Sequence, residues 1–300
     1  MTWLSDSAVS RLRDVADWPD FTQTKYELVE KAGHGGMASV YVARDKDLDR
    51  RVALKVIHTP VVDPLVQQRM LAEARIVARL EHPGILPVHD VGFLPDGRIY
   101  YAMKLVQGRR LDDFIETTAS LADRLRVFLK ICDAVAFAHS QGVIHRDLKP
   151  SNVMIGDFGA VLVIDWGLAK AGDSETLQGA ILGTPGYMAP EQEHGRTDAI
   201  DVRTDVYSLG VLLRSFLPPG TANSLQAISG KASSVSPAHR YSRVSELSEE
   251  VTRFLNGERV SAFPERIWQT ASRLAARHRT LVILIATYLA VRVVLLLVAR

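Results

Sequence analysis

The sequence is poor in cysteine and in net charge, and each shortage excludes a class of protein. Its single cysteine, Cys132, cannot form an internal disulfide, and its mostly apolar neighbours at 128–137 suggest a small buried hydrophobe in a reducing compartment. The formal net charge is only +2, with 36 Lys and Arg against 34 Asp and Glu, so no strong field favours nucleic acid as a partner. We therefore expect neither a disulfide scaffold nor a nucleic-acid-binding protein.

The sequence shows no internal repeat and no low-complexity linker, and we expect no secretory signal. Residues 1–24 alternate polar and apolar side chains, without an apolar run of signal-peptide length. The composition, 47% hydrophobic and 23% charged over 300 residues, is sufficient to bury a core and excludes intrinsic disorder and collagen-like structure. We expect one large domain or two smaller ones.

The spacing of apolar residues divides the chain into two halves of different class. Short β-branched segments at 40–43, 52–57 and 99–103 predict strands, with one helix at 66–80 among them. From 111 to 256 a period of about 3.6 residues dominates, as at 121–139 and 204–216, and predicts helices. Two lobes of different class indicate a cleft between them.

Three glycines, Gly33, Gly35 and Gly36, lie between two of the predicted strands. Glycine lets backbone N–H groups approach a phosphate closely, although a plain structural turn would use the same residues. Lys55 follows inside an otherwise apolar strand, and a buried ammonium group needs an anion. Glu73, on the predicted helix, and a phosphate are the two candidate anions; a solvated edge lysine is the alternative.

The most specific signal consists of two motifs. The first is the predicted loop His145-Arg146-Asp147-Leu148-Lys149-Pro150-Ser151-Asn152. The second, Asp165-Trp166-Gly167, begins thirteen residues after Asn152. In the loop, Asp147, Lys149 and Asn152 supply an acceptor for a hydroxyl proton, a cation for a phosphate and a metal ligand. Asp165, at the end of a predicted strand at 161–164, adds a second oxygen ligand for Mg²⁺.

These motifs resemble those of the eukaryotic-type (Hanks-type) protein kinases over roughly residues 26–256. Lys149 and Thr184 are similar to the Ser/Thr branch rather than the Tyr branch, the threonine lying in the stretch Gly183-Thr184-Pro185-Gly186-Tyr187-Met188-Ala189-Pro190-Glu191. The Gly-Gly-Met and Tyr-Met-Ala-Pro-Glu-Gln segments are similar to those of bacterial, membrane-anchored members. The resemblance implies an α+β, two-lobed protein-kinase fold, with a small β-rich N-lobe at 26–103 and a larger helical C-lobe at 107–256.

The resemblance also implies ATP and Mg²⁺ as cofactors and a role for each matching position. The three glycines would cover the phosphates, Lys55, held by Glu73, would grip the α- and β-phosphates, and the adenine would be bound by Val40, Ala53, Met103, Lys104, Val106 and Met154. Asp147 would orient and deprotonate the substrate hydroxyl, and Lys149 would neutralise the γ-phosphate. Asn152 and Asp165 would hold Mg²⁺.

Arg146 beside Asp147 implies regulation, because an arginine at this position in the family is the usual partner of a phosphorylated activation loop. Ser174, Thr176 and Thr184 are the candidate autophosphorylation sites. A purely polar loop is the alternative for Ser174 and Thr176.

Several positions depart from the family pattern. Ala38 stands where a third glycine is usual, and Trp166 stands where phenylalanine is usual. Family members normally carry a G helix, a protein-docking surface, where this chain runs through Pro218-Pro219-Gly220 directly into 224–232. We expect a shortened lobe that is still closed by Arg240 pairing with Glu191.

Two look-alike triplets compete for the metal-binding position, and Asp157-Phe158-Gly159 matches the usual family spelling better than Asp165-Trp166-Gly167. Asp157 lies only five positions after Asn152. A strand at 153–155, a turn at 156–159 and a returning strand at 161–164 would place Asp165 at the end of a hairpin and Asp157 at its tip. Spacing therefore favours Asp165.

The C-terminal tail predicts a membrane anchor. Residues 281–299 are apolar apart from Thr287, Tyr288 and Arg292, and nineteen helical residues span roughly 28 Å, the thickness of a bilayer core. Four arginines precede this span and one follows it, so the N-terminal side should be cytoplasmic. We expect an N-terminal extension at 1–25, a basic juxtamembrane segment at 257–279 and a single-pass helix at 280–299. A helix packed on its own domain or at an oligomer interface is the alternative.

The sequence thus predicts a membrane-tethered kinase that transfers the γ-phosphoryl of ATP to Ser or Thr of proteins, itself included. A catalytically silent pseudokinase acting as a membrane adaptor is the alternative, but it needs a missing catalytic group, and all six expected polar groups are present. A small-molecule or lipid kinase is a third reading, which Lys149 and the segment at 184–191 disfavour.

Overall fold

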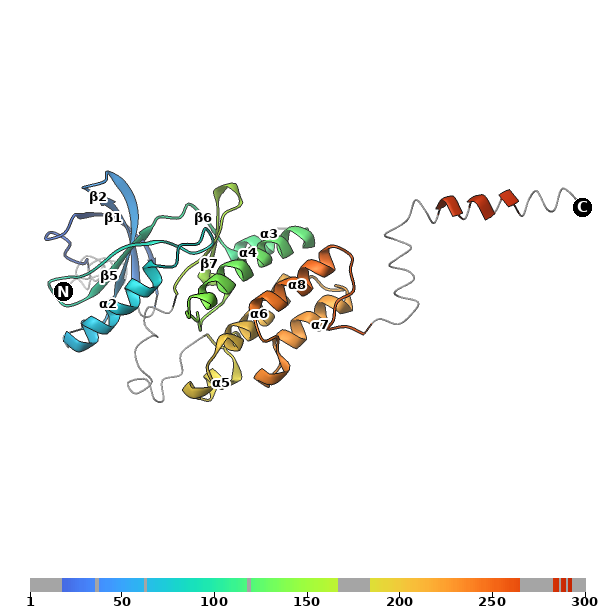
Figure 1. The fold of residues 1–300 in the computed structure, drawn as a ribbon. Helices are drawn as coiled ribbons and strands as arrows, with labels where there is room; N and C mark the ends of the chain where they lie inside the picture. Colours follow the sequence, from blue (N-terminus) through green and yellow to red (C-terminus); the bar gives the residue numbers. More distant parts are fainter. Residues whose placement is uncertain are drawn as a thin grey trace, which may run out of the picture.

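The computed structural model of this chain describes residues 18–35, 38–61, 64–117, 120–166 and 184–264, with 283–285, 287–289 and 291–292 of the tail. At Leu65, Arg69, Glu73 and Thr197 it describes the backbone only. Within these ranges the chain forms two lobes, a β-rich N-lobe and a helical C-lobe, joined at the end of β5 (Figure 1).

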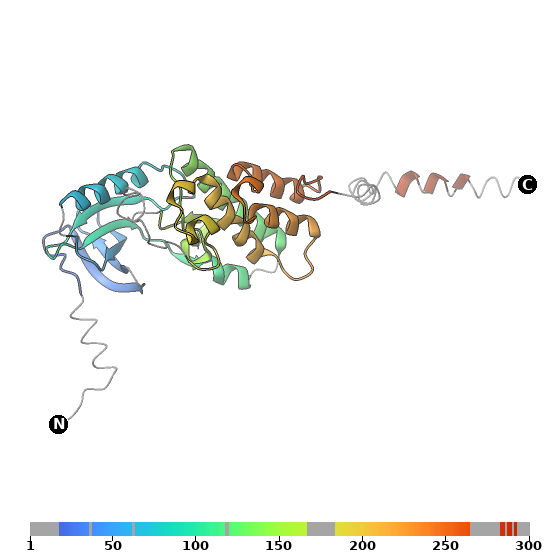
Figure 2. The ribbon, with the colours of Figure 1, turned by 90° about the horizontal axis from the view of Figure 1, so that it is seen from below.

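The N-lobe is a five-stranded antiparallel sheet with one helix packed against it. Its strand order is β1-β2-β3-β5-β4, and the strands are β1 (Tyr26–His34), β2 (Ala38–Asp45), β3 (Arg50–Ile57), β4 (Val88–Phe93) and β5 (Ile99–Lys104). The helix α2 (Pro64–Ala78) lies along the sheet in both views, and its Ala74 packs with Tyr101 and Met103 of β5 (Figures 1 and 2). The strand β5, which lies between β3 and β4, is buried over its first five residues, and its β-branched and aromatic side chains suit a buried strand.

The C-lobe is built around a helical core. Its helices are α3 (Leu111–Thr117), α4 (Leu121–Ser140), α5 (Pro190–Glu193), α6 (Val202–Phe216), α7 (Asn223–Ala232) and α8 (Val244–Leu255), with 3₁₀ turns η1 (Pro150–Asn152), η2 (Asp157–Gly159), η3 (Thr197–Ala199) and η4 (Pro237–His239). Ser120 caps α4 by accepting a hydrogen bond from the Asp123 amide at 3.3 Å, and Asp201 caps α6 in the same way. Cys132 is fully buried in this core, as predicted.

A small sheet joins the C-lobe to the interlobe junction. It has the order β6-β7-β8, with β6 (Gly108–Arg110), β7 (Val153–Gly156) and β8 (Val161–Val163). β7 and β8 pair antiparallel with Met154 opposite Leu162, and η2 forms the turn between them. The hairpin predicted from the spacing of the two triplets is therefore confirmed.

The packed structure extends beyond residues 26–256 at both ends. Phe21, 5% exposed, packs with Tyr26 and Tyr100 in the N-lobe core. After α8, Val260 is 1% exposed, and the buried Glu250 carboxylate accepts hydrogen bonds from the backbone N–H groups of residues 261 and 262. Neither segment shows a strong period in the sequence, so only packing reveals that they belong to the lobes.

Between α6 and α7 the chain runs through 217–222 without a helix, as expected from the shortened sequence.

In the tail, most of the predicted span at 280–299 lies outside the described residues. Those that are described are helical and carry exposed apolar side chains such as Leu284 and Leu289. A search of the described residues finds no helix with both the length and the hydropathy needed to cross a membrane.

Candidate active site

The predicted adenine-binding residues gather where the two lobes meet. Met103 of β5, Val106 of the connecting segment and Met154 of β7 belong to one apolar cluster. Ala53 lies opposite Met103 in the sheet, and Val40 lies opposite Lys55. The Lys104 amide donates to the Pro87 carbonyl at 3.2 Å, which holds the connecting segment to the N-lobe. The structure thus brings Met103, Val106 and Met154, which are far apart in the sequence, into one apolar cluster, with Ala53 next to Met103 in the sheet.

The glycine-rich segment forms the turn between β1 and β2. Gly33 lies opposite Val40, and the Gly35 amide donates to the Ala38 carbonyl at 2.9 Å; Gly36 lies outside the described residues. A Cβ atom built on Gly33 would meet no atom within 4 Å, so packing within the protein does not account for glycine there. Close approach of a phosphate would account for it. Ala38, in the place of the third glycine, lies in β2 without a positive φ.

Lys55 of β3 contacts Asp165, which follows β8 in the sequence. Its Nζ atom lies 2.7 Å from Asp165 Oδ1, and both side chains are partly buried. Sequence reasoning named Glu73 or a phosphate as the anion for Lys55 and did not consider Asp165. The backbone of Glu73 lies on α2, and its side chain is not among those described. Asp165 itself has a φ of 60°, an uncommon value for a non-glycine residue, and strained residues of this kind cluster at functional sites.

The loop at 145–152 brings its predicted catalytic groups together. Asn152 Nδ2 donates to the Asp147 carbonyl at 2.8 Å and to Asp147 Oδ2 at 3.2 Å. Lys149 Nζ lies 3.1 Å from Asp147 Oδ2 and donates to Thr184 Oγ1 at 2.5 Å. The Thr184 hydroxyl in turn donates to Asp147 Oδ1 at 3.2 Å. A carboxylate, an ammonium and a hydroxyl are therefore in mutual contact, which is the arrangement that positions a hydroxyl near a proton acceptor.

Asp205 of α6 holds this loop in place, and sequence reasoning did not assign it a role. It is fully buried and accepts hydrogen bonds from the His145 and Arg146 amides, each at 2.8 Å. Burial alone would raise the pKa of Asp205. Its contact with His139 at 2.8 Å and the hydrogen bond donated by the His145 amide outweigh burial and lower that pKa below its ordinary value. The signal that could have revealed this role in the sequence is an aspartate on a helix face whose other residues are mostly apolar.

Trp166 anchors the chain next to Asp165. Its indole Nε1 donates to the Val163 carbonyl at 3.1 Å, and its ring lies 4.8 Å from that of His145, which contacts the Ile164 carbonyl at 2.9 Å. Phenylalanine, the usual residue here, has no donor for the Val163 carbonyl. The tryptophan therefore adds a hydrogen bond that holds the chain in place next to Asp165.

The two look-alike triplets lie in different surroundings. Asp157 and the fully exposed Phe158 lie at the tip of the β7–β8 hairpin, where Lys130 donates to the Gly159 carbonyl at 2.7 Å. Asp165 lies at the opposite end, in contact with Lys55. The arrangement predicted for the two aspartates is confirmed.

A buried ion pair closes the C-lobe below the site. Arg240 donates to both oxygens of Glu191, at 2.6 and 2.8 Å, and Thr204 donates to the same carboxylate at 3.1 Å. Burial would raise the pKa of Glu191, but Arg240 lowers it below its ordinary value. The pairing of Arg240 with Glu191 that we expected from the sequence is confirmed.

The candidate autophosphorylation sites Ser174 and Thr176 lie outside the described residues.

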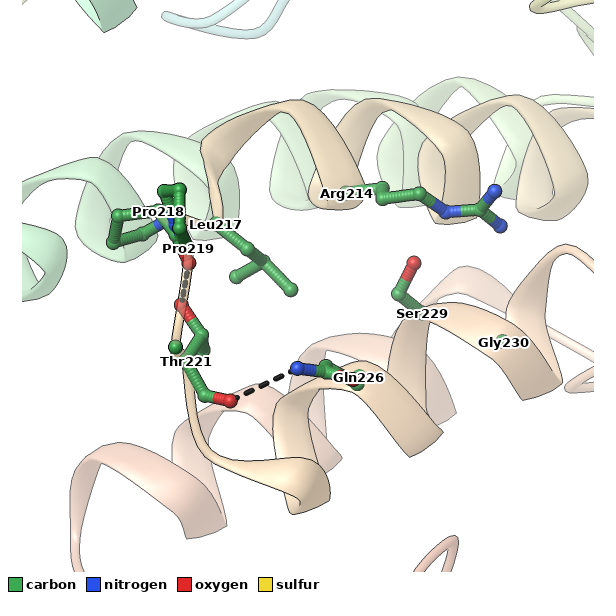
Figure 3. Close-up of a pocket in the computed structure, with 9 residues that line it drawn as sticks. Arg214, Leu217, Pro218, Pro219, Thr221, Gln226, Ser229 and Gly230 are labelled. Atoms are coloured by element: carbon green, nitrogen blue, oxygen red, sulfur yellow. Dashed lines mark hydrogen bonds between the residues drawn. The ribbon is translucent and has the colours of Figure 1, made fainter.

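A cavity of about 440 Å³ lies between α6 and α7, where the chain is shortened (Figure 3). It contains none of the predicted site residues. Gln226 of α7 donates to the Thr221 carbonyl at 3.0 Å, as the dashed line between these two residues in Figure 3 shows. The lining residues are Arg214, Leu217, Pro218, Pro219, Gly220, Thr221, Gln226, Ser229 and Gly230.

The chain is similar to known proteins. A family profile described as "Protein kinase domain" matches residues 26–266. The serine/threonine-protein kinase PknB of Mycolicibacterium smegmatis is 38% identical over 275 residues, which cover 86% of this chain and 43% of PknB. The serine/threonine-protein kinase PknD of Chlamydia trachomatis serovar D is 34% identical over 323 residues, which cover 85% of this chain and 33% of PknD.

A solved structure shows the same fold. The crystal structure of the Mycobacterium tuberculosis PknI kinase domain superposes with a TM-score of 0.63 and 25% identity, covering 77% of this chain and 96% of that domain. The chain spans between a third and a half of the length of the curated relatives it matches.

Proposed function

The chain belongs to the protein kinase family, among its bacterial Hanks-type Ser/Thr members, and we propose that it transfers the γ-phosphoryl group of Mg-ATP to Ser or Thr hydroxyls of proteins. The observation that carries this proposal is the contact of Lys55 with Asp165, beside the cluster of Asp147, Lys149 and Thr184. The Lys55–Asp165 contact links the proposed phosphate-binding lysine of the N-lobe to the part of the C-lobe that contains the proposed proton acceptor, Asp147.

The donor set fits a nucleotide and a hard divalent cation. Asp165 offers carboxylate oxygens, and Asn152 uses its amide nitrogen on Asp147, which leaves its carboxamide oxygen for the cation. Mg²⁺ held there would neutralise negative charge on the transferred phosphoryl group. Lys55 and the glycine-rich turn bind the phosphates, and Val40, Ala53, Met103, Lys104, Val106 and Met154 hold the adenine in the cleft.

The residues around Asp147 act on the substrate hydroxyl. Asp147 accepts its hydrogen bond and takes up its proton as the new phosphate ester forms. Lys149, 3.1 Å from this carboxylate, orients it and carries positive charge toward the γ-phosphate. Asp205 keeps the loop rigid through the two amides that it binds, so these groups stay in register.

We further propose that the chain phosphorylates itself at Ser174, Thr176 or Thr184. Arg146 follows His145 in the loop that Asp205 holds, and its φ of 65° turns the chain sharply beside Asp147. A phosphate on the segment that follows Asp165 would pair with this guanidinium by charge-assisted hydrogen bonds.

Membrane attachment through 281–299, with the kinase lobes on the cytoplasmic side, is the final part of the proposal. It is supported by the length and composition of this segment and by the arginines that precede it at 266, 273, 277 and 279. The helical residues at 283–285, 287–289 and 291–292 expose apolar side chains, which a bilayer would cover.

The decisive experiment incubates the full chain with Mg-ATP and a generic protein substrate, measures ADP release, and maps phosphorylated residues by mass spectrometry. We expect phosphoserine and phosphothreonine on the substrate and on the chain itself. The Asp147→Asn variant is the control, because it keeps the fold and removes the proton acceptor. ADP release no faster than in this variant, together with measurable ATP binding, would instead identify a pseudokinase.

A further inference from the structure

Two histidines contact one buried serine at the base of the glycine-rich turn. His34 Nδ1 lies 3.0 Å from Ser39 Oγ, and His58 Nε2 lies 2.9 Å from the same oxygen. The two imidazole rings are stacked, with centroids 5.1 Å apart and planes at 26°. Ser39 is 3% exposed. His34 belongs to β1, Ser39 to β2, and His58 directly follows β3, so this histidine–serine cluster joins all three strands.

The two contacts of the serine are satisfied by one distribution of protons. A hydroxyl has a single proton, so Ser39 donates to one ring nitrogen and accepts an N–H from the other imidazole. The imidazole that accepts must be neutral. If both imidazoles donated, the Ser39 proton would need a third partner, and neither contact supplies one. A buried polar group that has its partners costs little, whereas one that loses a partner destabilises its surroundings.

The histidine–serine cluster lies on the face of the sheet that is turned away from the proposed nucleotide site. Ser39 lies opposite Val56 of β3, and the neighbouring pair along the same two strands is Val40 and Lys55. Successive side chains of a strand point to opposite faces. Val40 and Lys55, which belong to the proposed ATP site, therefore point to the other face. The cluster acts on the nucleotide through the backbone of the turn rather than by touching it.

We propose that His34, Ser39 and His58 are positioning residues for ATP, which hold the glycine-rich turn in the conformation that binds the phosphates. This inference rests on the proposed kinase function. His34 lies between Gly33 and Gly35, the positions where backbone N–H groups would approach a phosphate. The link to the end of β3 through His58 limits the movement of this segment, so less ordering remains to be done when ATP binds.

The same arrangement makes the cluster sensitive to pH. Histidine is the side chain that changes its charge between about pH 5 and pH 8. An accepting imidazole that gains a proton becomes a donor, so the Ser39 hydroxyl loses its acceptor, and two protonated rings in a stack repel each other. We expect the link between the strands to loosen as the pH falls, and the turn to move more freely.

The charged groups of the neighbouring strands favour the neutral form of the rings. Lys31 of β1 lies opposite Tyr41, the next residue of β2 on the face that carries the cluster. Tyr100 of β5 lies opposite Val56 on that face, and burial raises its pKa, so it stays neutral. Asp45 pairs with Arg50 at the opposite end of β2 and β3. A positive charge near an imidazole disfavours its protonation, so Lys31 supports the intact cluster at neutral pH.

Hydrogen exchange tests the positioning role without reference to catalysis. In the nucleotide-free full chain, in detergent micelles at neutral pH, Ser39→Ala should speed exchange of the Gly35 amide by about fivefold, the factor that corresponds to one lost hydrogen bond. Amides of α8, in the other lobe, should exchange as in the parent, which excludes a global loss of stability. Ser39→Thr keeps the hydroxyl and should recover slow exchange. Unchanged exchange of the turn in Ser39→Ala would overturn the positioning role.

Steady-state kinetics measure the consequence for ATP. Ser39→Ala should raise the KM for ATP on the order of fivefold and change kcat much less, because none of the three side chains touches the reacting groups. A merely structural role would lower the fraction of active enzyme, and so kcat, without this shift in KM. Equal KM values for ATP in the parent and in Ser39→Ala would overturn the coupling between the cluster and the nucleotide.

The pH profile tests whether the cluster titrates. Between neutral pH and about pH 5.5, the KM for ATP should rise more steeply in the parent than in the double variant His34→Gln, His58→Gln, whose amides carry no charge. The titration of ATP itself is common to both proteins. His239→Gln, which alters an exposed histidine of η4, is the matched control and should follow the parent. Parallel profiles in the parent and the double variant would overturn the pH dependence.

Failure of the cluster and failure of the proposed function are distinguishable. A parent that transfers no phosphate would refute the kinase function and, with it, the role of the cluster in ATP use. The exchange of the turn amides in Ser39→Ala decides in either case whether the histidine–serine cluster holds the turn.

Discussion

At the scale of single residues, the surroundings of an aspartate decide its role more than the triplet that contains it. Asp157 and Asp165 each precede an aromatic residue and a glycine. One is exposed at a hairpin tip, and the other contacts Lys55 at 2.7 Å. Equivalent substitutions at the two positions therefore form a matched pair.

We expect Asp165→Asn to lower phosphoryl transfer by at least about a hundredfold, because it removes a charged ligand at the site where charge develops. Asp157→Asn should change activity little and cost less than about 1 kcal/mol of stability, since it alters only an exposed turn residue. Steady-state assays at saturating Mg-ATP make the comparison. Loss of activity in Asp157→Asn with an active Asp165→Asn would contradict the assignment.

The hydroxyl of Thr184 is expected to support catalysis directly. Thr184→Val keeps the volume but removes the contacts with Lys149 and Asp147, and should lower kcat at least about tenfold, because hydrogen bonds to charged groups contribute about 1.5–3 kcal/mol. Thr184→Ser restores the hydroxyl and should recover most of the activity. The steady-state kcat and KM of both variants provide the test, with similar losses in the two counting against a role for the hydroxyl.

At the scale of elements, buried carboxylates attach neighbouring segments to one another. Asp205 fixes the loop at 145–152 to α6, and Glu191 ties α5 to Arg240 before α8. Their contacts lower both pKa values below the ordinary values of 3.8 and 4.5. A carboxylate with a lowered pKa stabilises the folded state above its ordinary pKa, and this contribution is lost as the pH falls through the lowered value.

We therefore expect the free energy of unfolding to be steady from pH 7 to about 5 and to fall progressively below about pH 4.5. Arg240→Met should cost about 3–5 kcal/mol at neutral pH, because it leaves Glu191 buried without its partner. The double variant Glu191→Gln, Arg240→Met removes both charges and should be more stable than the single variant, with a smaller acid dependence. Urea unfolding at several pH values measures these free energies of unfolding. If the stability of the parent falls no more steeply in acid than that of the double variant, the Glu191–Arg240 pair does not contribute to the acid dependence.

The connection between α6 and α7 should affect substrate docking rather than chemistry. Residues 217–222 and the cavity beside them lie where the family resemblance implies a docking helix that this chain lacks between α6 and α7, and they share no residue with the proposed ATP site. We expect a KM for ATP in the ordinary range of about 1 μM to 1 mM, together with poor turnover of generic protein substrates. Efficient phosphorylation of such substrates with an ordinary KM would contradict this prediction.

At the scale of the whole molecule, the tail should decide where the lobes are found. The full chain should remain in the membrane pellet after carbonate or high-salt washing. A chain ending at residue 279 keeps the arginines at 266, 273, 277 and 279 but lacks the apolar segment, and it should be released. Sedimentation and immunoblotting make the comparison. Release of the full chain by carbonate would indicate a helix lying on the membrane surface instead of spanning the bilayer.

Features that depend on local spacing could be predicted from the amino-acid sequence. Strands β2, β3 and β5, helices α2, α4 and α6, and the β7–β8 hairpin follow from periodicity and turn residues, because side-chain direction repeats along a strand or helix. The same local spacing singled out Asp147, Lys149 and Asn152, which lie within one short loop.

Which distant residues meet depends on how the sheets and helices pack. Lys55 contacts Asp165, Asp205 binds the amides at 145 and 146, and His58 reaches Ser39. Packing also drew Phe21 and Val260 into the lobes, beyond the boundaries expected from sequence pattern. Each of these contacts joins segments whose relative position depends on how sheets and helices pack, and periodicity along the chain carries no information about that position.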